Sequence, residues 1–139
     1  MANVEYLVLV VRDLERALGL YERGLGFARI EDVSDVPAIG ARRIFLRAEN
    51  CLLELLEPHD ETKPPGAFLR ARGEGVFALG VRAADVEETL AQLRRAGIAA
   101  AGPTGGGSGS GEGEYWYLRP ADAHGVLVEL SASGAPPAI

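Results

Sequence analysis

The sequence has a single cysteine and no long apolar segment. Its 139 residues include one cysteine, one methionine, one tryptophan and two histidines. A single cysteine, Cys51, excludes an intrachain disulfide, so the fold must be held by its apolar core. No apolar run reaches the roughly 18–20 residues that cross a bilayer, and no basic segment with an apolar stretch precedes the first strand pattern. We expect a cytoplasmic protein with no membrane partner.

Positive charge is also scarce. Fourteen lysines and arginines stand against 20 aspartates and glutamates, which gives a formal net charge of −6 and a pI near 4.9. Such a surface repels the phosphate backbone of nucleic acids, so we exclude nucleic acid as a partner. A hydrophobic content of 47% with 24% charged residues is typical of a globular chain that buries one core.

What the chain does contain is an internal repeat. The stretches Val4 to Phe27 and Val76 to Ile98 share a pattern in which an apolar segment is followed by an aspartate and an amphipathic helix. Asp13 and Asp85 stand at the positions of helix N-caps, where a carboxylate accepts a backbone hydrogen bond. The repeat indicates two similar halves.

Each half begins with a strand and a helix. The apolar runs predict strands over Val4–Val11 and Val76–Val81, and glycines end both helices. Apolar residues at helical spacing predict the side of each helix that faces a core. These residues are Leu14, Ala17, Leu18, Tyr21 and Leu25 in the first helix, and Val86, Leu90 and Leu93 in the second.

The remainder of each half repeats as well. The separation between the two capping aspartates also relates Phe45 to Tyr117, and the segment CLLELLEP around Glu54 matches GVLVELSA around Glu129. Each half therefore has the order β-α-β-β-β, which predicts the α+β fold class. The expected parts are short strands at about 28–33 and 98–101, module one at 4–57, a connector at 58–74 with a helical turn at 67–72, module two at 75–131, a single domain over 1–133 and a tail at 134–139.

The segment 102–114 is rich in glycine and serine, a composition typical of flexible loops. It lacks the spacing of a phosphate-binding loop and leads into no helix, which argues against a phosphate site. The segment is either a solvent-exposed hairpin loop or a lid over a pocket.

One glutamate interrupts the last apolar strand of each half, Glu54 in the first half and Glu129 in the second. Because successive side chains of a strand point to opposite faces, Glu54 and Glu129 each face away from the helix-facing residues beside them. Burying an isolated carboxylate is costly. We therefore expect both glutamates to line a cavity or to bind something.

Taken together, the motifs resemble those of the vicinal oxygen chelate (VOC) superfamily, which includes glyoxalase I, extradiol dioxygenases, bleomycin-resistance proteins and methylmalonyl-CoA epimerase. The resemblance covers about Val4 to Ser131 and is nearest to the epimerase branch. It rests on V-R-D-L-E-R-A-L-x-x-Y, L-G-F, L-E-L-L-E-P, D-V-E-x-x-L-x-x-L-x-x-x-G-I and G-V-L-V-E-L. It implies two pseudo-symmetric βαβββ modules that form an open eight-stranded cup.

The resemblance also implies where a metal would be held. The epimerase pattern has a histidine, a glutamine or glutamate, a second histidine and a glutamate at the positions that correspond here to Tyr6, Glu54, Ala78 and Glu129. Both histidines are replaced, and two carboxylates with water would hold a divalent cation only weakly. We expect no cofactor and no tightly bound metal. His59 and His124 are either surface turn residues or reach the cup from a partner subunit.

Alternation adds an aromatic and basic wall to the expected cup. Arg43 shares a strand face with Phe45 and stands where the resemblance expects the epimerase carboxylate. Tyr115 and Tyr117 share a face of the equivalent strand, and Arg82 lies on the strand that follows the connector. The tyrosines either line the cup or pack in the core with bonded hydroxyls. The arginines either pair with the two glutamates or bind an anion.

These residues support more than one function. We predict a metal-independent or metal-degenerate enzyme of the isomerase, epimerase or cyclase type, in which Glu54 and Glu129 transfer protons and Tyr6 donates a proton or holds an oxyanion. A ligand-binding or sequestering protein of the bleomycin-resistance kind is the alternative, and a metal-dependent epimerase or glyoxalase-type lyase with an atypical site is a third. The partner is a small molecule in each case, and the resemblance implies a homodimer that covers exposed sheet edges.

Overall fold

The computed structural model describes residues 2–105 and 114–132. They form two compact units: a first unit of residues 7–77, and a second unit of residues up to Tyr6 together with those from Ala78 onward. Strands β1 (Asn3–Val10) and β6 (Gly75–Arg82) each have residues in both units.

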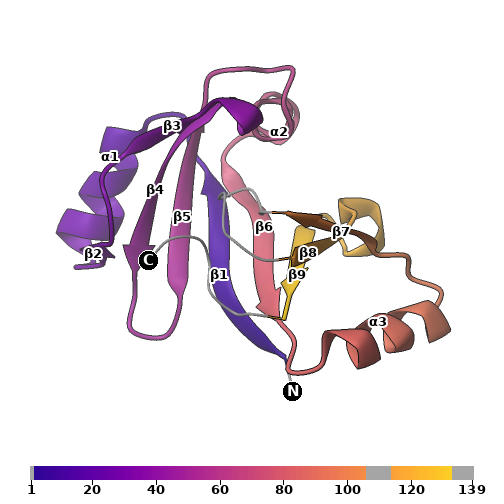
Figure 1. The fold of residues 1–139 in the computed structure, drawn as a ribbon. Coiled ribbons are helices and arrows are strands. Elements are labelled where there is room, and N and C mark those ends of the chain that lie inside the picture. The colour runs from indigo at the N-terminus through magenta and orange to yellow at the C-terminus, as the bar shows by residue number, and fades with distance from the viewer. Residues whose placement is uncertain (1, 106–113, 133–139) are drawn as a thin grey trace. The chain divides into compact units, whose positions relative to one another are not determined.

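The first unit is an antiparallel sheet with a helix on one face (Figure 1). Strand β4 pairs with β5 along its whole length, and both β2 and β3 pair with β4. The strands are β2 (Ala28–Arg29), β3 (Ser34–Val36), β4 (Ala41–Arg47) and β5 (Leu52–Pro58), and the helices are α1 (Leu14–Leu18) and α2 (Pro64–Arg72).

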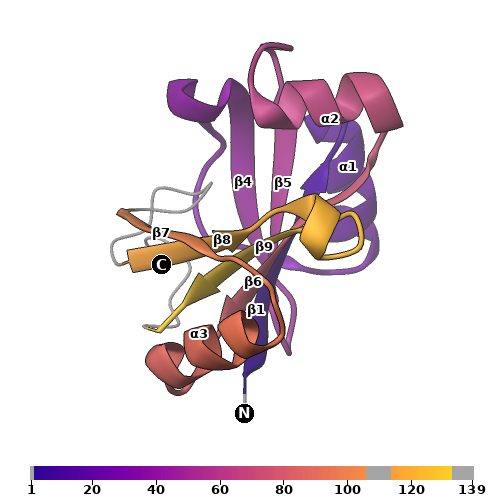
Figure 2. The ribbon, with the colours of Figure 1, turned by 90° about the vertical axis from the view of Figure 1, so that its right-hand side faces the viewer.

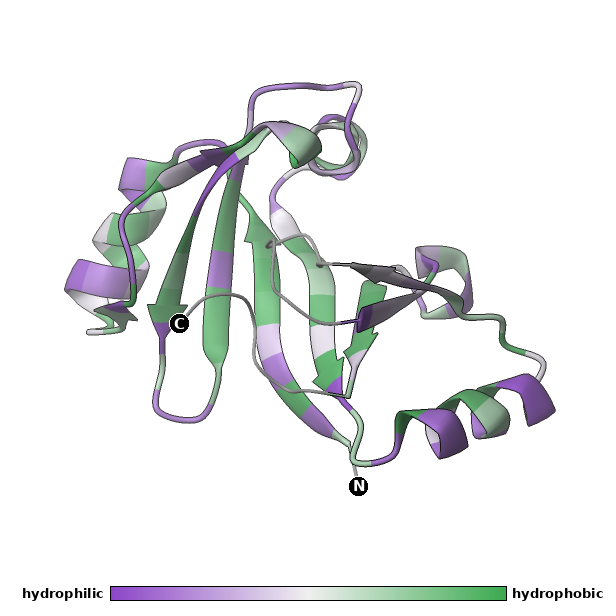
Figure 3. Ribbon diagram, in the orientation of Figure 1, coloured by the Kyte–Doolittle hydropathy of each residue, from purple (hydrophilic) through white to green (hydrophobic). Residues whose placement is uncertain are grey.

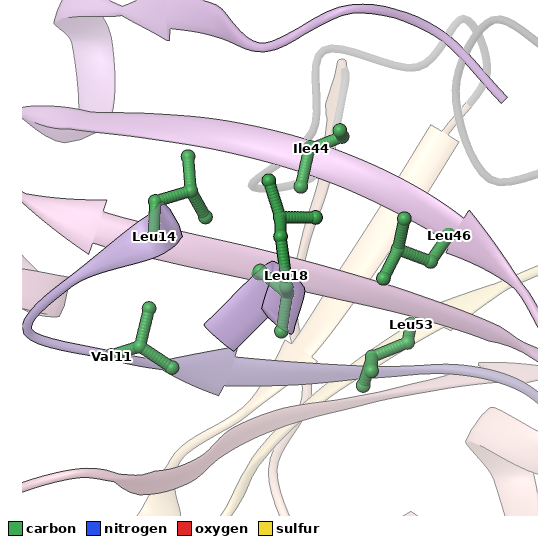
Figure 4. Close-up of a cluster of buried hydrophobic side chains, with 7 residues drawn as sticks. Val11, Leu14, Leu18, Ile44, Leu46 and Leu53 are labelled. Carbon is green, nitrogen blue, oxygen red and sulfur yellow. The ribbon is translucent and has the colours of Figure 1, made fainter. Parts of the chain in front are cut away.

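The core of the first unit lies between α1 and one face of β4 and β5. Asp13 caps α1 as predicted, because its carboxylate accepts a hydrogen bond of 3.1 Å from the backbone N–H of Arg16. Leucines of α1 then contact the largely hydrophobic strands β4 and β5 (Figures 3 and 4). The cluster consists of Val11, Leu14, Leu18, Ile44, Leu46, Leu53 and Leu55.

The second unit also contains paired strands and a helix. Strand β6 pairs parallel with β9, while β8 lies antiparallel between β9 and β7 (Figure 2). Its elements after β6 are α3 (Val86–Arg95), β7 (Ala101–Gly105), β8 (Glu114–Leu118) and β9 (Leu127–Ser131). Helix α3 contributes Val86, Leu90 and Leu93 to an apolar cluster with Trp116 and Leu130.

The second half follows the predicted β-α-β-β-β order, whereas the first half has one strand more, because both β2 and β3 precede β4. The fold class is α+β as predicted. The connector contains the nine-residue helix α2, which is longer than the single turn expected there. Within the described residues, no helix is both long and apolar enough to span a bilayer. The single-domain boundary stays a prediction. Residues 106–113 of the glycine-rich segment and the 134–139 tail lie outside the described residues.

The predicted core position of Leu25 is wrong. After α1 the chain continues as a π-helical segment, Gly19–Gly24, in which the Leu25 N–H donates to the Leu20 carbonyl rather than to residue 21. The wider turn rotates the following residues relative to an α-helix. Leu25 is consequently 58% exposed, whereas Tyr21 still packs against the core.

Two predicted strands begin or end elsewhere. The strand expected at 28–33 is shorter, since β2 ends at Arg29 and a separate strand, β3, begins at Ser34. The residues between them include the acidic pair Glu31 and Asp32, residue types depleted in strands. The strand expected at 98–101 starts three residues later. The Ile98 N–H is used instead to cap α3, donating to the Leu93 carbonyl at 2.9 Å beside the left-handed Gly97.

The cap of α3 gives the first prediction. The Asp85 carboxylate accepts a hydrogen bond of 3.0 Å from the Glu88 N–H. Asp85→Ala should therefore lower the free energy of unfolding by about 1 kcal/mol, measured by urea denaturation. Glu87→Gln, a nearby exposed change of charge, is the matched control, and an equal loss in both variants would mean that the cap contributes nothing of its own.

Candidate functional site

Strand pairing in the second unit places Glu129 on the face of the sheet away from α3. Glu129 lies opposite Tyr117 on β8 and beside Gly80 on β6, while its neighbour Leu130 lies opposite Trp116 on the helix side. The alternation expected from the sequence is therefore the one that the strands adopt.

The carboxylate of Glu129 has a specific partner. Its side chain is completely buried, and its Oε2 atom accepts a hydrogen bond from the hydroxyl of Tyr6, which is 4% exposed. Tyr6 comes from the beginning of β1, in the same unit. A hydrogen bond from a hydroxyl to a carboxylate is stronger than one between neutral groups, and it fixes the orientation of both side chains.

Tyr117 lies at the more accessible side of this pair. Its ring is only partly buried, and its directly paired neighbour on β9 is Glu129. Burial raises the pKa of the Tyr117 hydroxyl above its ordinary value of 10.0, the negative charge of Glu129 raises it further, and a hydrogen bond with Thr104 lowers it. The hydroxyl of Tyr117 is thus kept protonated at neutral pH and can serve as a hydrogen-bond donor.

The first unit holds the second glutamate in an ion pair. Glu54 lies opposite Phe45 in the β4–β5 pairing, on the face away from α1. Arg43 shares that face, with one guanidinium nitrogen 3.7 Å from the Glu54 carboxylate and its central carbon 5.2 Å from the centre of the Phe45 ring. Both charged side chains are buried, at 7% and 0% exposed. Of the two roles left open for Arg43, the structure supports pairing with Glu54.

The predicted site residues are therefore gathered in two groups. Tyr6, Ala78, Tyr115, Tyr117 and Glu129 share a face of the second unit, and Arg43, Phe45 and Glu54 share a face of the first. That Glu54 and Glu129 act together stays a prediction.

Of the two roles left open for Arg82, the structure does not support pairing with Glu54 or Glu129, and anion binding stays a prediction. Arg82 Nε lies 2.9 Å from a carboxylate oxygen of Glu5, and its side chain is 43% exposed. Arg82 is the last residue of β6 and is exposed there. Glu5 gave no signal in the sequence, because an acidic residue at the start of a strand looks like an ordinary surface residue.

Sequence reasoning also missed Gly80 and Thr104. Thr104 contributes the hydrogen bond to Tyr117, and it lies in the segment that we expected to be a loop. Gly80 interrupts an apolar strand beside Glu129. A glycine inside a strand often marks a place where another group approaches the backbone closely, and that signal was available.

The histidines lie apart from both groups of site residues. His59 is exposed, with its Nε2 atom 2.6 Å from the Asp35 carboxylate. His124 is exposed in the turn before β9, with a positive φ of 61°. Among the described residues both fit the interpretation as surface residues.

A cavity of about 630 Å³ opens in the first unit beside α1. It is lined by residues of β1, α1 and the π-helical segment, together with Glu74 and Gly75. None of the predicted site residues lines it, so it lies away from the chemistry described above.

The donor atoms at the family's metal positions do not fit a tightly held divalent cation, which needs several oxygen or imidazole donors. Ala78 offers only a methyl group. The Tyr6 hydroxyl donates to Glu129, and a guanidinium lies next to Glu54. Within residues 2–105 and 114–132, no three histidine, cysteine or acidic side chains are grouped as metal ligands would be.

The chain is similar to known proteins over nearly its whole length. A family model described as the Glyoxalase/Bleomycin resistance protein/Dioxygenase superfamily matches residues 3–130. The ethylmalonyl-CoA/methylmalonyl-CoA epimerase of Cereibacter sphaeroides is 30% identical over 132 residues, which cover 94% of this chain and 97% of that protein.

Solved structures give the same result. The methylmalonyl-CoA epimerase from Mycobacterium tuberculosis is 27% identical, with a TM-score of 0.76, covering 98% of this chain and 88% of that one. A methylmalonyl-CoA epimerase in complex with methylmalonyl-CoA and NH4+ is also 27% identical, with a TM-score of 0.78 and 99% of both chains covered.

The buried ion pair generates a prediction for stability. Glu54→Gln removes the negative charge beside the buried Arg43 guanidinium and should cost about 3–5 kcal/mol of unfolding free energy. Replacing both residues, as Arg43→Met with Glu54→Leu, should recover most of that loss. The measurement is chemical denaturation, and a single variant as stable as the parent would show that the pair is not needed for folding.

The raised pKa of Tyr117 predicts that the stability of the fold decreases at alkaline pH. Its folded-state pKa is raised, so the unfolded chain loses this proton first as the pH passes the ordinary value of 10.0. The contribution of Tyr117 is therefore fully present below that pH and is lost as the pH rises toward the folded-state pKa. Tyr117→Phe should give a flatter decline in melting temperature above about pH 10, with a constant difference from the parent below about pH 9. Parallel curves across the whole range would argue against the raised pKa.

Proposed function

The chain belongs to the Glyoxalase/Bleomycin resistance protein/Dioxygenase superfamily, and on this basis we propose that it is an isomerase-type enzyme that moves a proton at a carbon atom next to a carbonyl group. The observation that carries the proposal is the buried Glu129 carboxylate held by the Tyr6 hydroxyl. An oriented carboxylate in a site with little water is suited to act as a general base.

In the proposed reaction, Glu129 takes the proton from the substrate carbon. The C–H bond breaks, an O–H bond forms on the carboxylate, and the electron pair moves onto the carbonyl oxygen to give an enolate. Tyr6 keeps its hydrogen bond to Oε2 and so holds the carboxylate in place. The protonated hydroxyl of Tyr117, on the accessible side, donates to the enolate oxygen. Delivery of a proton to the opposite face of the same carbon reforms a C–H bond, returns the electron pair from the enolate oxygen and completes the isomerisation.

We infer the substrate class from the relatives and from two differences between this chain and the family's epimerases. The relatives are named as epimerases of methylmalonyl-CoA or ethylmalonyl-CoA, so an acyl thioester is the class to test first. Arg43 stands where the family's epimerases have a carboxylate, and Ala78 stands where they have a metal-binding histidine. We therefore propose a metal-independent enzyme whose preferred thioester differs from that of the relatives.

The role of Glu54 remains part of the hypothesis. As a second proton carrier it would return the proton to the opposite face of the carbon, which is what an epimerisation requires. The Arg43 guanidinium beside it gives the same carboxylate a structural function. We also retain from the sequence the expectation of a homodimer that binds a small molecule.

A ligand-binding protein is the second candidate function. It is favoured by the aromatic residues around a buried negative charge, since Tyr6 bonds to Glu129 and Tyr117 lies opposite it. Such an arrangement attracts planar or cationic molecules. Binding without exchange of the ligand's carbon-bound protons distinguishes this function from the enzyme.

Proton exchange in D₂O tests the proposal. With methylmalonyl-CoA and other 2-branched acyl thioesters, the parent protein should incorporate deuterium at the carbon next to the carbonyl, followed by NMR. Glu129→Gln should slow the exchange at least about 100-fold, and Tyr6→Phe should slow it by about 10-fold or more. Glu114→Gln, an exposed change of the same kind on β8, is the matched control.

The proposal fails if the parent protein gives no exchange above background with any of these thioesters. It also fails if Glu129→Gln exchanges protons as fast as the parent protein. Circular dichroism of each variant establishes that the fold is retained.

A further inference from the structure

Gly80 occupies a position where a glycine needs an explanation. It lies in the interior of β6, between Leu79 and Val81, and is paired in register with Glu129 on the parallel strand β9. Glycine weakens a strand, because it loses more conformational freedom on folding and offers no side chain for packing. Its backbone angles are not among the positive-φ conformations that favour glycine. The reason for glycine here must therefore lie in the space above its Cα atom.

That space is filled by the ring of Tyr6. A Cβ atom added at Gly80 would lie 2.2 Å from Cε1, 2.3 Å from Cζ and 2.4 Å from Cδ1 of the Tyr6 ring. Contacts below 3.0 Å are essentially never seen for a real Cβ, so even a methyl group would force a shift. Cζ is the atom that bears the hydroxyl, and the hydroxyl is the group that bonds to Glu129.

We propose that Gly80 is the positioning residue of the site: its missing side chain lets the Tyr6 ring lie against β6 with the hydroxyl on Glu129. The three residues form one contiguous arrangement within the second unit, because Gly80 contacts the ring and neighbours the carboxylate that the ring's hydroxyl binds. Any side chain at position 80 moves Cζ, and the hydroxyl moves with it. The effect on catalysis rests on the proposed function, whereas the effect on the hydrogen bond does not.

The competing explanation is that Tyr6 only covers a glycine. An aromatic ring from a neighbouring strand stabilises a glycine in a sheet by packing over it, and a phenylalanine would do so equally well. Under that explanation the hydroxyl and its orientation are incidental. The two explanations differ in what happens to the hydroxyl proton and to activity, so both can be measured.

The hydroxyl proton of Tyr6 provides a readout that does not depend on activity. A buried phenol proton that is donated to a carboxylate exchanges slowly with solvent and is shifted downfield in the proton NMR spectrum. It is assigned by its loss in Tyr6→Phe. In Gly80→Ala we expect this resonance to disappear or to move upfield, because the added methyl displaces Cζ. Gly19→Ala, where an added Cβ meets only the end of the Arg23 side chain at 3.4 Å, should leave it unchanged.

Activity gives the second measurement. In the exchange assay, Gly80→Ala should lower kcat about as much as Tyr6→Phe, by about 10-fold or more, with a smaller change in KM. In the Tyr6→Phe background, Gly80→Ala should add little, because the hydroxyl that it displaces is already gone. Independent, multiplying effects of the two substitutions would overturn the proposal, as would a folded Gly80→Ala with an unchanged downfield resonance.

The positioning role of Gly80 and the proposed function can be tested separately. If the resonance is lost in Gly80→Ala but no exchange activity exists in the parent protein, the positioning role stands and the proposed function fails. If Gly80→Ala does not fold, Gly80→Ala combined with Tyr6→Val is examined by thermal melting. Recovery of the fold in the double variant supports a clash with the Tyr6 ring, and continued unfolding rejects it.

Discussion

A carboxylate can be buried in a protein only when another group compensates its charge, because transfer of an isolated ion out of water is very costly. Two fully buried glutamates, Glu54 and Glu129, impose this constraint on the two units of the chain. Each lies on a strand whose other face is packed against a helix, so neither can reach solvent on that side. The residues around each glutamate therefore include a group that stabilises the buried carboxylate.

The two units stabilise their buried glutamates with different chemical groups. Glu54 is compensated by a full positive charge, since the Arg43 guanidinium is buried beside it and rests against Phe45. Glu129 accepts a hydrogen bond from an uncharged hydroxyl of Tyr6. A hydroxyl orients a carboxylate without adding a positive charge next to it, whereas a guanidinium favours the ionised, paired state. This difference is why we assign proton transfer to Glu129 first.

The chain also differs from its family at the positions where a metal would be held. The chain belongs to a superfamily whose relatives include acyl-CoA epimerases, yet it has tyrosine and alanine where the resemblance expects histidines. Tyrosine at position 6 is larger than histidine, and its ring is accommodated only because position 80 is glycine. The tyrosine at position 6 and the glycine at position 80 on a neighbouring strand are thus sterically linked, although Gly80 contacts no substrate in our proposal.

The sequence by itself determined the α+β class, the β-α-β-β-β order of the second half, the caps of α1 and α3, and the strand faces of Glu54 and Glu129, because these depend on local capping and on side-chain alternation. It did not determine the partner of Arg82, the exposure of Leu25 or the clash that reserves position 80 for glycine. Those depend on which strands pair, on a π-helical turn and on distances between residues far apart in the chain. Such contacts leave no periodic signal in a single sequence, so only the tertiary structure decided them.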